Sequence, residues 1–150
     1  MFLKLRPAQA ADHDAIAEIW HNSASLPGVG PIAMPTLAQL EERVPREVEA
    51  GWDVTIAVDE TGLVGFLALK QHETILTELF VRPGSLGTGI GRALFAEAVA
   101  ATPEGFTLFT RAGNDRARRF YERAGMILLR EAIHPKYSNA IVYYGWNVRS

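Results

Sequence analysis

The sequence predicts a mixed α/β protein (an α+β mixed sheet) in which helices pack on one sheet, in the order β-α-α-β-β-β-α-β-α-β-β. Two observations support this prediction. Short β-prone apolar runs, bounded by turn-forming residues, alternate with apolar patterns of helical period along the chain. One such run, residues 75–81, leads through a Pro-Gly break and a glycine-rich turn directly into an apolar-periodic helix. Because the chain shows no internal repeat, low-complexity tract or linker, residues 1–150 are expected to form a single domain.

The N-terminal fifty residues indicate a strand, two helices and the loop between them. Residues 2–6 alternate apolar and basic side chains, which is typical of a half-buried strand. Asp12 can cap the first helix. Residues 23–35 contain three prolines and two glycines and are expected to form a loop whose apolar side chains cover part of the molecule. Thr36 is expected to cap the second helix, in which Pro45 predicts a kink or a break.

The rest of the chain alternates strands with helices. Residues 59–62 predict the tight turn of a hairpin. Asn114 is expected to cap the last helix, and Gly125 is a natural C-terminal stop. The expected strands lie at 54–58, 63–69, 75–81, 106–110, 126–132 and 140–146, and the expected helices at 89–101 and 114–125.

Composition excludes several function classes. A net charge of -2 argues against binding nucleic acid or a membrane by bulk electrostatics. The absence of cysteine excludes disulfides and thiolate ligands, and His21, His72 and His134 show no metal-like spacing, so no metal is expected. No apolar run approaches the roughly 20 residues of a membrane span. The N-terminus is charged too early for a signal peptide, and we therefore expect a cytoplasmic protein.

A glycine-rich turn is the strongest local signal in the chain. Gly87, Gly89 and Gly91 fall where a strand becomes a helix, so the backbone there can adopt positive φ and approach a ligand closely. The first N–H groups of the helix have no intrahelical partner and form an anion site, most often for phosphate. The spacing lacks the lysine of a P-loop and does not match a Rossmann fingerprint. The alternative is a glycine-rich turn that binds nothing.

Two motifs in this chain resemble those of the GNAT superfamily of N-acetyltransferases. The segment 86–91 (LGTGIG) is similar to motif A, Gln/Arg-x-x-Gly-x-Gly/Ala, with Leu86 departing at the first position. In the family, this first position is thought to act on the pyrophosphate mainly through its backbone. The segment 114–126 (NDRARRFYERAGM) is similar to motif B, N-x-x-A-x-x-F-Y-E-x-x-G-F, with Met126 in place of the final Phe. The order of predicted elements is also that of the GNAT fold, so the resemblance covers nearly the whole chain.

The resemblance implies a fold, an activity and a co-substrate. In the GNAT fold the strand before the glycine loop splays from the strand after it, and the pantetheine arm of acetyl-CoA lies in the gap. The implied activity is direct transfer of an acetyl group from acetyl-CoA to a primary amine of a small molecule or peptide, and homodimers are common in similar proteins. The residues implied to bind the co-substrate are Phe80, Val81, Leu86, Gly87, Thr88, Gly89, Ile90, Gly91, Arg92 and Asn114.

Two residues are candidates for proton transfer. Tyr121 can protonate the departing thiolate, since a phenol of pKa about 10 is protonated at neutral pH. Its alternative is a core tyrosine with a satisfied hydroxyl, and Asn114 has a capping alternative as well. Glu78 is the best side-chain candidate for the base, although the family's usual basic positions on this strand are Ile75 and Thr77 here. The alternative is that Glu78 is a surface-facing strand carboxylate, in which case a chain of water molecules would deprotonate the amine.

The acceptor site is expected among the N-terminal residues, the loop 27–35 and the loop 134–139, whose apolar character favours a small or partly apolar amine. A second function class is a non-catalytic acyl-CoA-binding regulator on the same fold. A local basic cluster fits either the phosphates of coenzyme A or a solvated helix face; its members are Arg111, Arg116, Arg118, Arg119 and Arg123.

Overall fold

The computed structural model of the chain describes residues 2–148 and confirms the predicted order of elements. The strands are β1 (Leu3–Pro7), β2 (Asp53–Asp59), β3 (Gly62–Lys70), β4 (Ile75–Val81), β5 (Phe106–Arg111), β6 (Ile127–Ile133) and β7 (Ala140–Trp146). The α-helices are α1 (His13–Ala24), α2 (Leu37–Glu49), α3 (Ile90–Ala101) and α4 (Asp115–Arg123). Short 3₁₀ turns lie at Ala10–Asp12, Gln71–Glu73 and Pro83–Ser85.

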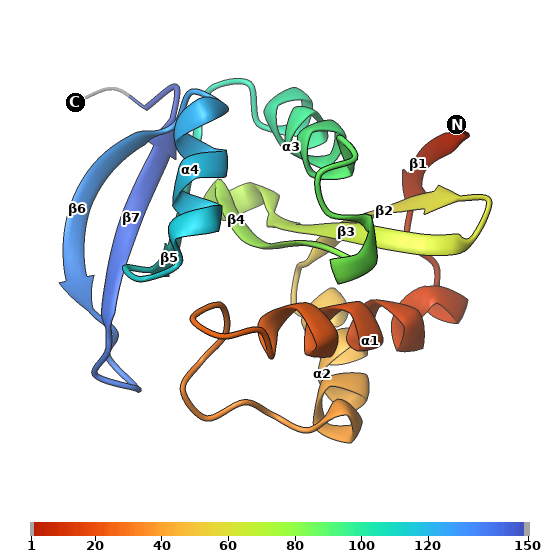
Figure 1. Cartoon of the computed structure of the whole chain (residues 1–150). Coiled ribbons are helices and arrows are strands. Elements are labelled where there is room, and N and C mark those ends of the chain that lie inside the picture. The colour runs from red at the N-terminus through yellow and green to blue at the C-terminus, as the bar shows by residue number, and fades with distance from the viewer. Residues whose placement is uncertain (1, 149–150) are drawn as a thin grey trace.

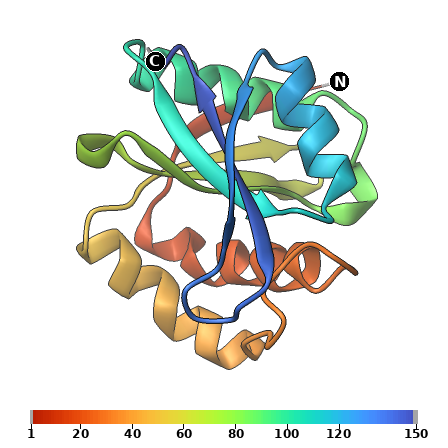
Figure 2. The same cartoon turned by 90° about the vertical axis from the view of Figure 1, so that its left-hand side faces the viewer.

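One seven-stranded sheet, in the order β1-β2-β3-β4-β5-β7-β6, forms the middle layer. Helices α1 and α2 cover one face and α3 and α4 the other (Figures 1 and 2). Each face has its own apolar cluster, with Trp20, Leu40 and Phe66 on the α1/α2 side and Leu94, Phe106 and Tyr144 on the α3/α4 side. No helix between residues 2 and 148 is long and apolar enough to cross a membrane.

The sheet opens between β4 and β5. These two strands are the parallel neighbours of the sheet, and they pair only at Ile75 and Thr107. Just beyond that pair, β4 carries an extra residue, Thr77, because Ala68 lies opposite Glu78 and Leu69 opposite Leu76. Such a bulge bends the strand that contains it. The Thr77 hydroxyl donates a hydrogen bond of 3.0 Å to the Ala68 carbonyl.

Two local predictions in the N-terminal region are wrong. Asp12 does not cap α1 with its side chain; the carboxylate accepts hydrogen bonds from Arg6 and from the Gln9 N–H within the preceding 3₁₀ turn. Pro45 does not break α2, since the helix continues to Glu49, and the alternative of a kink stays a prediction. Pro45 lies on the exposed side of the helix, where water can bond to the carbonyl that loses its donor.

The caps of α2 and α4 form as predicted. The Thr36 hydroxyl accepts a hydrogen bond from the Gln39 N–H, and the Asn114 side-chain oxygen accepts one from the Ala117 N–H. Gly125, two residues past α4, has φ 99°, the left-handed conformation expected of a helix stop.

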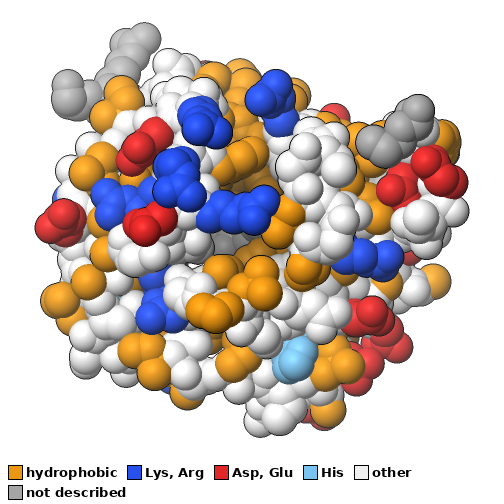
Figure 3. Space-filling model, viewed as in Figure 1, with side chains coloured by type: hydrophobic (Ala, Val, Ile, Leu, Met, Phe, Trp, Pro, Cys, Tyr) orange, Lys and Arg blue, Asp and Glu red, His pale blue; other side chains and the backbone are white. Residues whose placement is uncertain are grey.

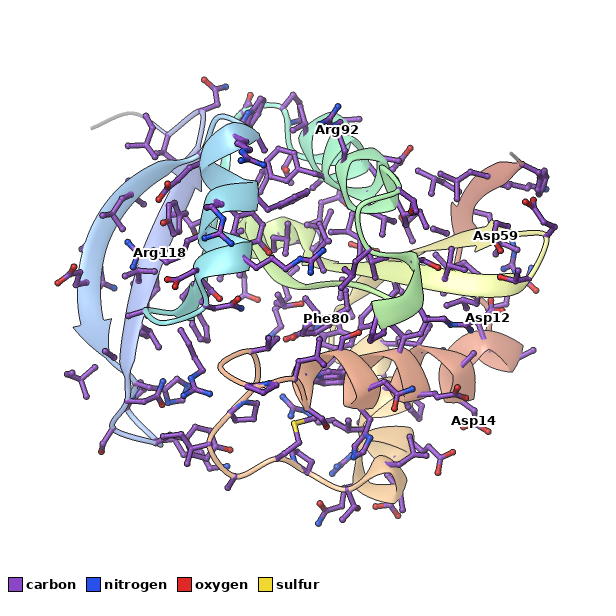
Figure 4. The ribbon with its side chains drawn as sticks, in the orientation of Figure 1. Asp12, Asp14, Asp59, Phe80, Arg92 and Arg118 are labelled. Atoms are coloured by element: carbon purple, nitrogen blue, oxygen red, sulfur yellow. The ribbon has the colours of Figure 1, made fainter. Side chains whose placement is uncertain are left out.

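A buried tyrosine fixes α4 against β7. The Tyr144 hydroxyl donates a hydrogen bond of 2.6 Å to Glu122 and accepts one of 3.0 Å from Arg118. Arg118 lies between α4 and β7 in Figure 4 and also donates to the Ala112 carbonyl. Burial and the bond to Glu122 raise the pKa of Tyr144. This network sets the position of α4 and therefore of Tyr121, whose ring centroid lies 6.2 Å from that of Tyr144.

Candidate active site

A cavity of about 1350 Å³ passes through the opening between β4 and β5. It is lined by residues of α3 and α4 on one side of the sheet and by residues of α1, α2 and the loop between them on the other. Figure 3 shows a hollow in the middle of this face, with lysine and arginine side chains along its rim. The loop between β6 and β7 closes the α1/α2 side, where it runs toward the α1–α2 loop (Figures 1 and 2).

The glycine turn has the conformation that its sequence predicts. Gly87 and Gly89 have φ of 81° and 88°, and a Cβ built on either would meet nothing within 4 Å. The requirement for glycine at these two positions is therefore conformational. Gly91 has a different role, because a Cβ there would lie 3.3 Å from the Phe120 ring. This glycine allows α3 to approach α4 closely.

The start of α3 offers unpaired backbone donors. The Ala93 N–H bonds to the Gly89 carbonyl, and no acceptor within residues 2–148 pairs with the N–H groups of Ile90, Gly91 or Arg92. These groups carry the positive end of the helix dipole. Together they form an anion site on the cavity wall.

The other residues of the segment 86–92 differ in how they lie relative to the cavity. Leu86 lines the cavity and packs its side chain against the apolar core, so its departure from motif A is accommodated by packing. Thr88 is the one residue of segment 86–92 that does not line the cavity, and its hydroxyl donates to the Ser85 carbonyl within the turn. Arg92 is exposed on α3, at the edge of the cavity.

The register of β3 and β4 decides which backbone groups face the opening. The Arg82 N–H bonds to the Val64 carbonyl, and antiparallel pairs alternate, so the backbone of Phe80 faces β3. The backbone groups of Leu79 and Val81 consequently face the opening. Ser23 of α1 donates a hydrogen bond of 3.1 Å to the Val81 carbonyl. The Phe80 ring lies between the sheet and α1 (Figure 4), so Phe80 contributes a side chain to the cavity wall.

Tyr121 is a buried tyrosine with a free hydroxyl. Its side chain is 8% exposed and lines the cavity, and no hydrogen-bond partner for its hydroxyl lies in the described part of the chain. The core-tyrosine reading, which requires a satisfied hydroxyl, instead describes Tyr144. Burial, and next the charge of Glu78, raise the pKa of Tyr121 above its ordinary value. The hydroxyl therefore stays protonated at physiological pH.

Glu78 lies inside the cavity, so the surface-facing alternative is wrong. Along β4 it shares a face with Phe80, which packs toward α1 and α2. Burial raises the pKa of Glu78 to about 8; the charge of Arg43 opposes this shift, and Glu47 adds to it. Glu78 and Tyr121 both line the cavity, and the charge of Glu78 adds to the raised pKa of the phenol.

The predicted basic cluster is split by the fold. Arg116, Arg119 and Arg123 line the cavity on the α4 side. Arg118 belongs to the Tyr144 network and does not line the cavity. Arg111, at the end of β5, donates a hydrogen bond of 3.0 Å to the Gly30 carbonyl in the α1–α2 loop.

Asn114 lines the cavity, and both ends of its amide are engaged within the protein. The side-chain oxygen caps α4, and the nitrogen donates to the Thr110 hydroxyl at 3.3 Å. Its structural role is therefore to position the start of α4. Within residues 2–148 no group of three or more His, Asp or Glu side chains could hold a metal ion.

Several cavity residues were not predicted from the sequence. Ser23 contacts Val81, 58 residues away, and Arg43 projects from α2 over the Trp20 ring at 4.9 Å. Only the apolar content of the loop 23–35 indicated that this region covers part of the molecule.

A family model described as an acetyltransferase (GNAT) domain matches residues 50–125, which contain the glycine turn, Glu78 and Tyr121. The chain belongs to the GNAT acetyltransferase family. The predicted family and fold are thereby confirmed. No curated protein matches the sequence.

Solved structures of the family share this fold over nearly the whole chain. The apo form of YjaB from Escherichia coli is 22% identical, with a TM-score of 0.75 and 97% of each chain covered. A GNAT-family acetyltransferase from Bacillus cereus is 14% identical, with a TM-score of 0.76 and coverage of 99% of this chain and 100% of that one. Phosphinothricin acetyltransferase from Sinorhizobium meliloti, in complex with acetyl-CoA, is 20% identical, with a TM-score of 0.75 and coverage of 97% and 88%.

The raised pKa of Glu78 predicts a pH-dependent stability difference. Between about pH 4.5 and 8 the folded protein keeps a proton on Glu78 that the unfolded chain releases. The free energy of unfolding of the wild type, relative to that of Glu78→Gln, is therefore highest below pH 4.5. It falls as the pH rises from 4.5 through 8. We expect the melting temperature of Glu78→Gln to exceed that of the wild type increasingly from pH 5 to about pH 8, and by a constant margin above that pH.

The matched control is Glu97→Gln, which replaces an exposed glutamate on α3 and should show no such trend. A difference between Glu78→Gln and wild type that stays constant from pH 5 to pH 9 would show that Glu78 titrates like an exposed carboxylate.

Proposed function

We propose that this protein transfers an acetyl group from acetyl-CoA directly to a primary amine of a small molecule or peptide. The proposal rests above all on the presence, in one cavity at the opening of the sheet, of the free Tyr121 hydroxyl and the Glu78 carboxyl. Tyr121 keeps its proton at neutral pH, and Glu78 has a pKa of about 8, near the working pH. An acid and a base with separated pKa values are what amine acetylation by a thioester requires.

The cavity has the features that coenzyme A needs. The unpaired N–H groups at the start of α3 suit the diphosphate, and the left-handed Gly87 and Gly89 let it approach the backbone. Arg116, Arg119 and Arg123 suit the remaining phosphate. When bound, acetyl-CoA supplies the activated acetyl group as a thioester. The outward-facing N–H of Val81 is the donor that we assign to the thioester oxygen, on which negative charge develops.

Glu78 removes the proton that the amine must lose, directly or through one water. A base is most effective when its pKa lies near the operating pH. An α-amine of pKa about 7.7–8.0 is matched to Glu78 at about 8, so the proton moves at almost no cost in free energy. The carbon–nitrogen bond then forms as the carbon–sulfur bond breaks.

Tyr121 protonates the sulfur as it leaves. Its hydroxyl is protonated at physiological pH and its proton is committed to no protein acceptor within residues 2–148, so it is available to the sulfur as the carbon–sulfur bond breaks. A protein that only bound acyl-CoA would need neither this free hydroxyl nor a carboxyl in the same cavity, and the alternative of a binding module is therefore not favoured.

Acetyl-CoA binding should depend on the left-handed conformation of Gly89. Valine is strained at a φ of 88°, so Gly89→Val should move the N–H groups at the start of α3 and abolish measurable binding by calorimetry. Gly62→Val introduces comparable strain at φ 117° in the β2–β3 hairpin, far from the cavity, and should leave the affinity unchanged. Equal affinity for acetyl-CoA in Gly89→Val and wild type would remove the phosphate site from the proposal.

Turnover should depend on the Tyr121 hydroxyl. Tyr121→Phe keeps the ring and its packing, so kcat should fall by about 10²–10⁴-fold while the KM for acetyl-CoA changes little. Tyr143→Phe is the matched control, because it removes the hydroxyl of a half-buried tyrosine on β7 that does not line the cavity. That change should keep kcat within a few-fold of wild type. Wild-type turnover in Tyr121→Phe would assign the proton to water.

A further inference from the structure

The charges lining the cavity restrict what the acceptor can carry besides its amine. Glu78 is the one carboxyl among the lining residues, against seven arginines and lysines. A polyamine would be attracted by a single negative charge and repelled by the seven positive ones. The walls on the α1/α2 side include the apolar side chains of Trp20, Leu26, Met34 and Leu40. We call this side of the cavity the acceptor chamber.

Arg111 is a cation of this chamber with no counter-ion. It is half-buried, and one guanidinium nitrogen donates to the Gly30 carbonyl. No carboxylate lies within 4 Å of it in the part of the chain that the structure describes. A guanidinium has five N–H donors in a planar fork, so donors remain for a ligand. Removing such a charge from water without an anionic partner is unfavourable.

The other two cations of the acceptor chamber are differently placed. Arg43 lies 3.5 Å from Glu47 and covers the Trp20 ring. Lys136 is exposed in the β6–β7 loop. Arg111 is therefore the one of the three that is both half-buried and unpaired.

Arg111 and Glu78 lie on the two walls of the opening. Glu78 is three residues beyond the Ile75–Thr107 pair along β4, and Arg111 is four residues beyond it along β5. Because Thr77 is an extra residue in a bulge, Glu78 lies about two ladder positions past the last pair, and both residues lie on the open part of their strands. The contact with Gly30 places Arg111 on the α1/α2 side of the sheet, which is also the side of Glu78.

We infer that the acceptor is an amine that also carries a carboxylate, which Arg111 binds while Glu78 faces the amine. The rest of the acceptor is apolar and packs against the chamber walls. Bidentate bonds from a guanidinium fork to a carboxylate supply both affinity and orientation. This inference rests on the proposed function, because it names the acceptor of that reaction.

The test compares each carboxylated amine with its amide. Leucine is paired with leucinamide and 6-aminohexanoate with 6-aminohexanamide, which gives two spacings between the charges. For each pair, the ratio of kcat/KM is measured by thiol release from acetyl-CoA in wild type, Arg111→Gln and Lys136→Gln. Each acid-to-amide ratio is compared between the wild type and the variants. The difference in basicity between the acid and its amide therefore cancels. Affinities for the acetylated products are measured by calorimetry, which requires no turnover.

We expect Arg111→Gln to lower the acid-to-amide ratio at least about tenfold for one of the pairs, and Lys136→Gln to change it less than threefold. The affinity for acetyl-CoA should stay constant. An unchanged ratio in Arg111→Gln for both pairs, or a larger loss in Lys136→Gln, would overturn the inference. If thiol release is absent but product binding shows the Arg111-dependent preference, the proposed function fails and the carboxylate site stands.

Discussion

The early separation of β4 from β5 is the constraint on which the site depends. Two parallel neighbours that pair at a single position leave the backbone groups of Leu79 and Val81 without sheet partners. Buried backbone polar groups need partners, so such an opening is stable only when side chains, water or a ligand supply them. The Ser23 hydroxyl already satisfies the Val81 carbonyl, and the Thr77 hydroxyl satisfies a carbonyl at the bulge. The N–H of Val81 remains for a ligand.

The same opening brings together groups that an unbroken sheet would keep apart. Glu78 projects toward α1 and α2, whereas Tyr121 belongs to the apolar cluster of α3 and α4. The charge of Glu78 can act on Tyr121 because no strand lies between them. Burial disfavours the charged form of each group, so the pKa of Glu78 rises to about 8 and that of Tyr121 rises above its ordinary value. The network of Tyr144, Arg118 and Glu122 fixes α4 and thereby holds the phenol in place.

The order of elements and the glycine turn were predictable because they depend on local physics. Hydrophobic period, the caps at Thr36 and Asn114, and the positive φ of Gly87 and Gly89 are properties of a few neighbouring residues. The two local errors also have local causes. Asp12 was drawn into a turn by Arg6, a partner six residues away, and the exposure of Pro45 could not be read from α2 alone.

The site itself depends on register and on long-range contacts. The bulge at Thr77 and the pairing with β3 decide that Val81, and not Phe80, turns its backbone to the opening. The five arginines look alike in the sequence, yet Arg111 and Arg118 are separated from the others by hydrogen bonds to Gly30 and Tyr144. Such assignments need the folded chain, because residues adjacent in sequence take partners from different elements.

The central claim is that Glu78, which lines the same cavity as Tyr121, accepts the proton of the amine. The most direct measurement is the pH dependence of kcat/KM for wild type and Glu78→Gln, with two amines of different basicity. If the claim holds, the acidic limb of the wild-type profile contains a step near pH 8 for both amines, and Glu78→Gln removes that step and lowers the rate about 10²-fold or more. A limb that moves with the pKa of the amine and is indifferent to the substitution would contradict it, and would assign deprotonation to solvent.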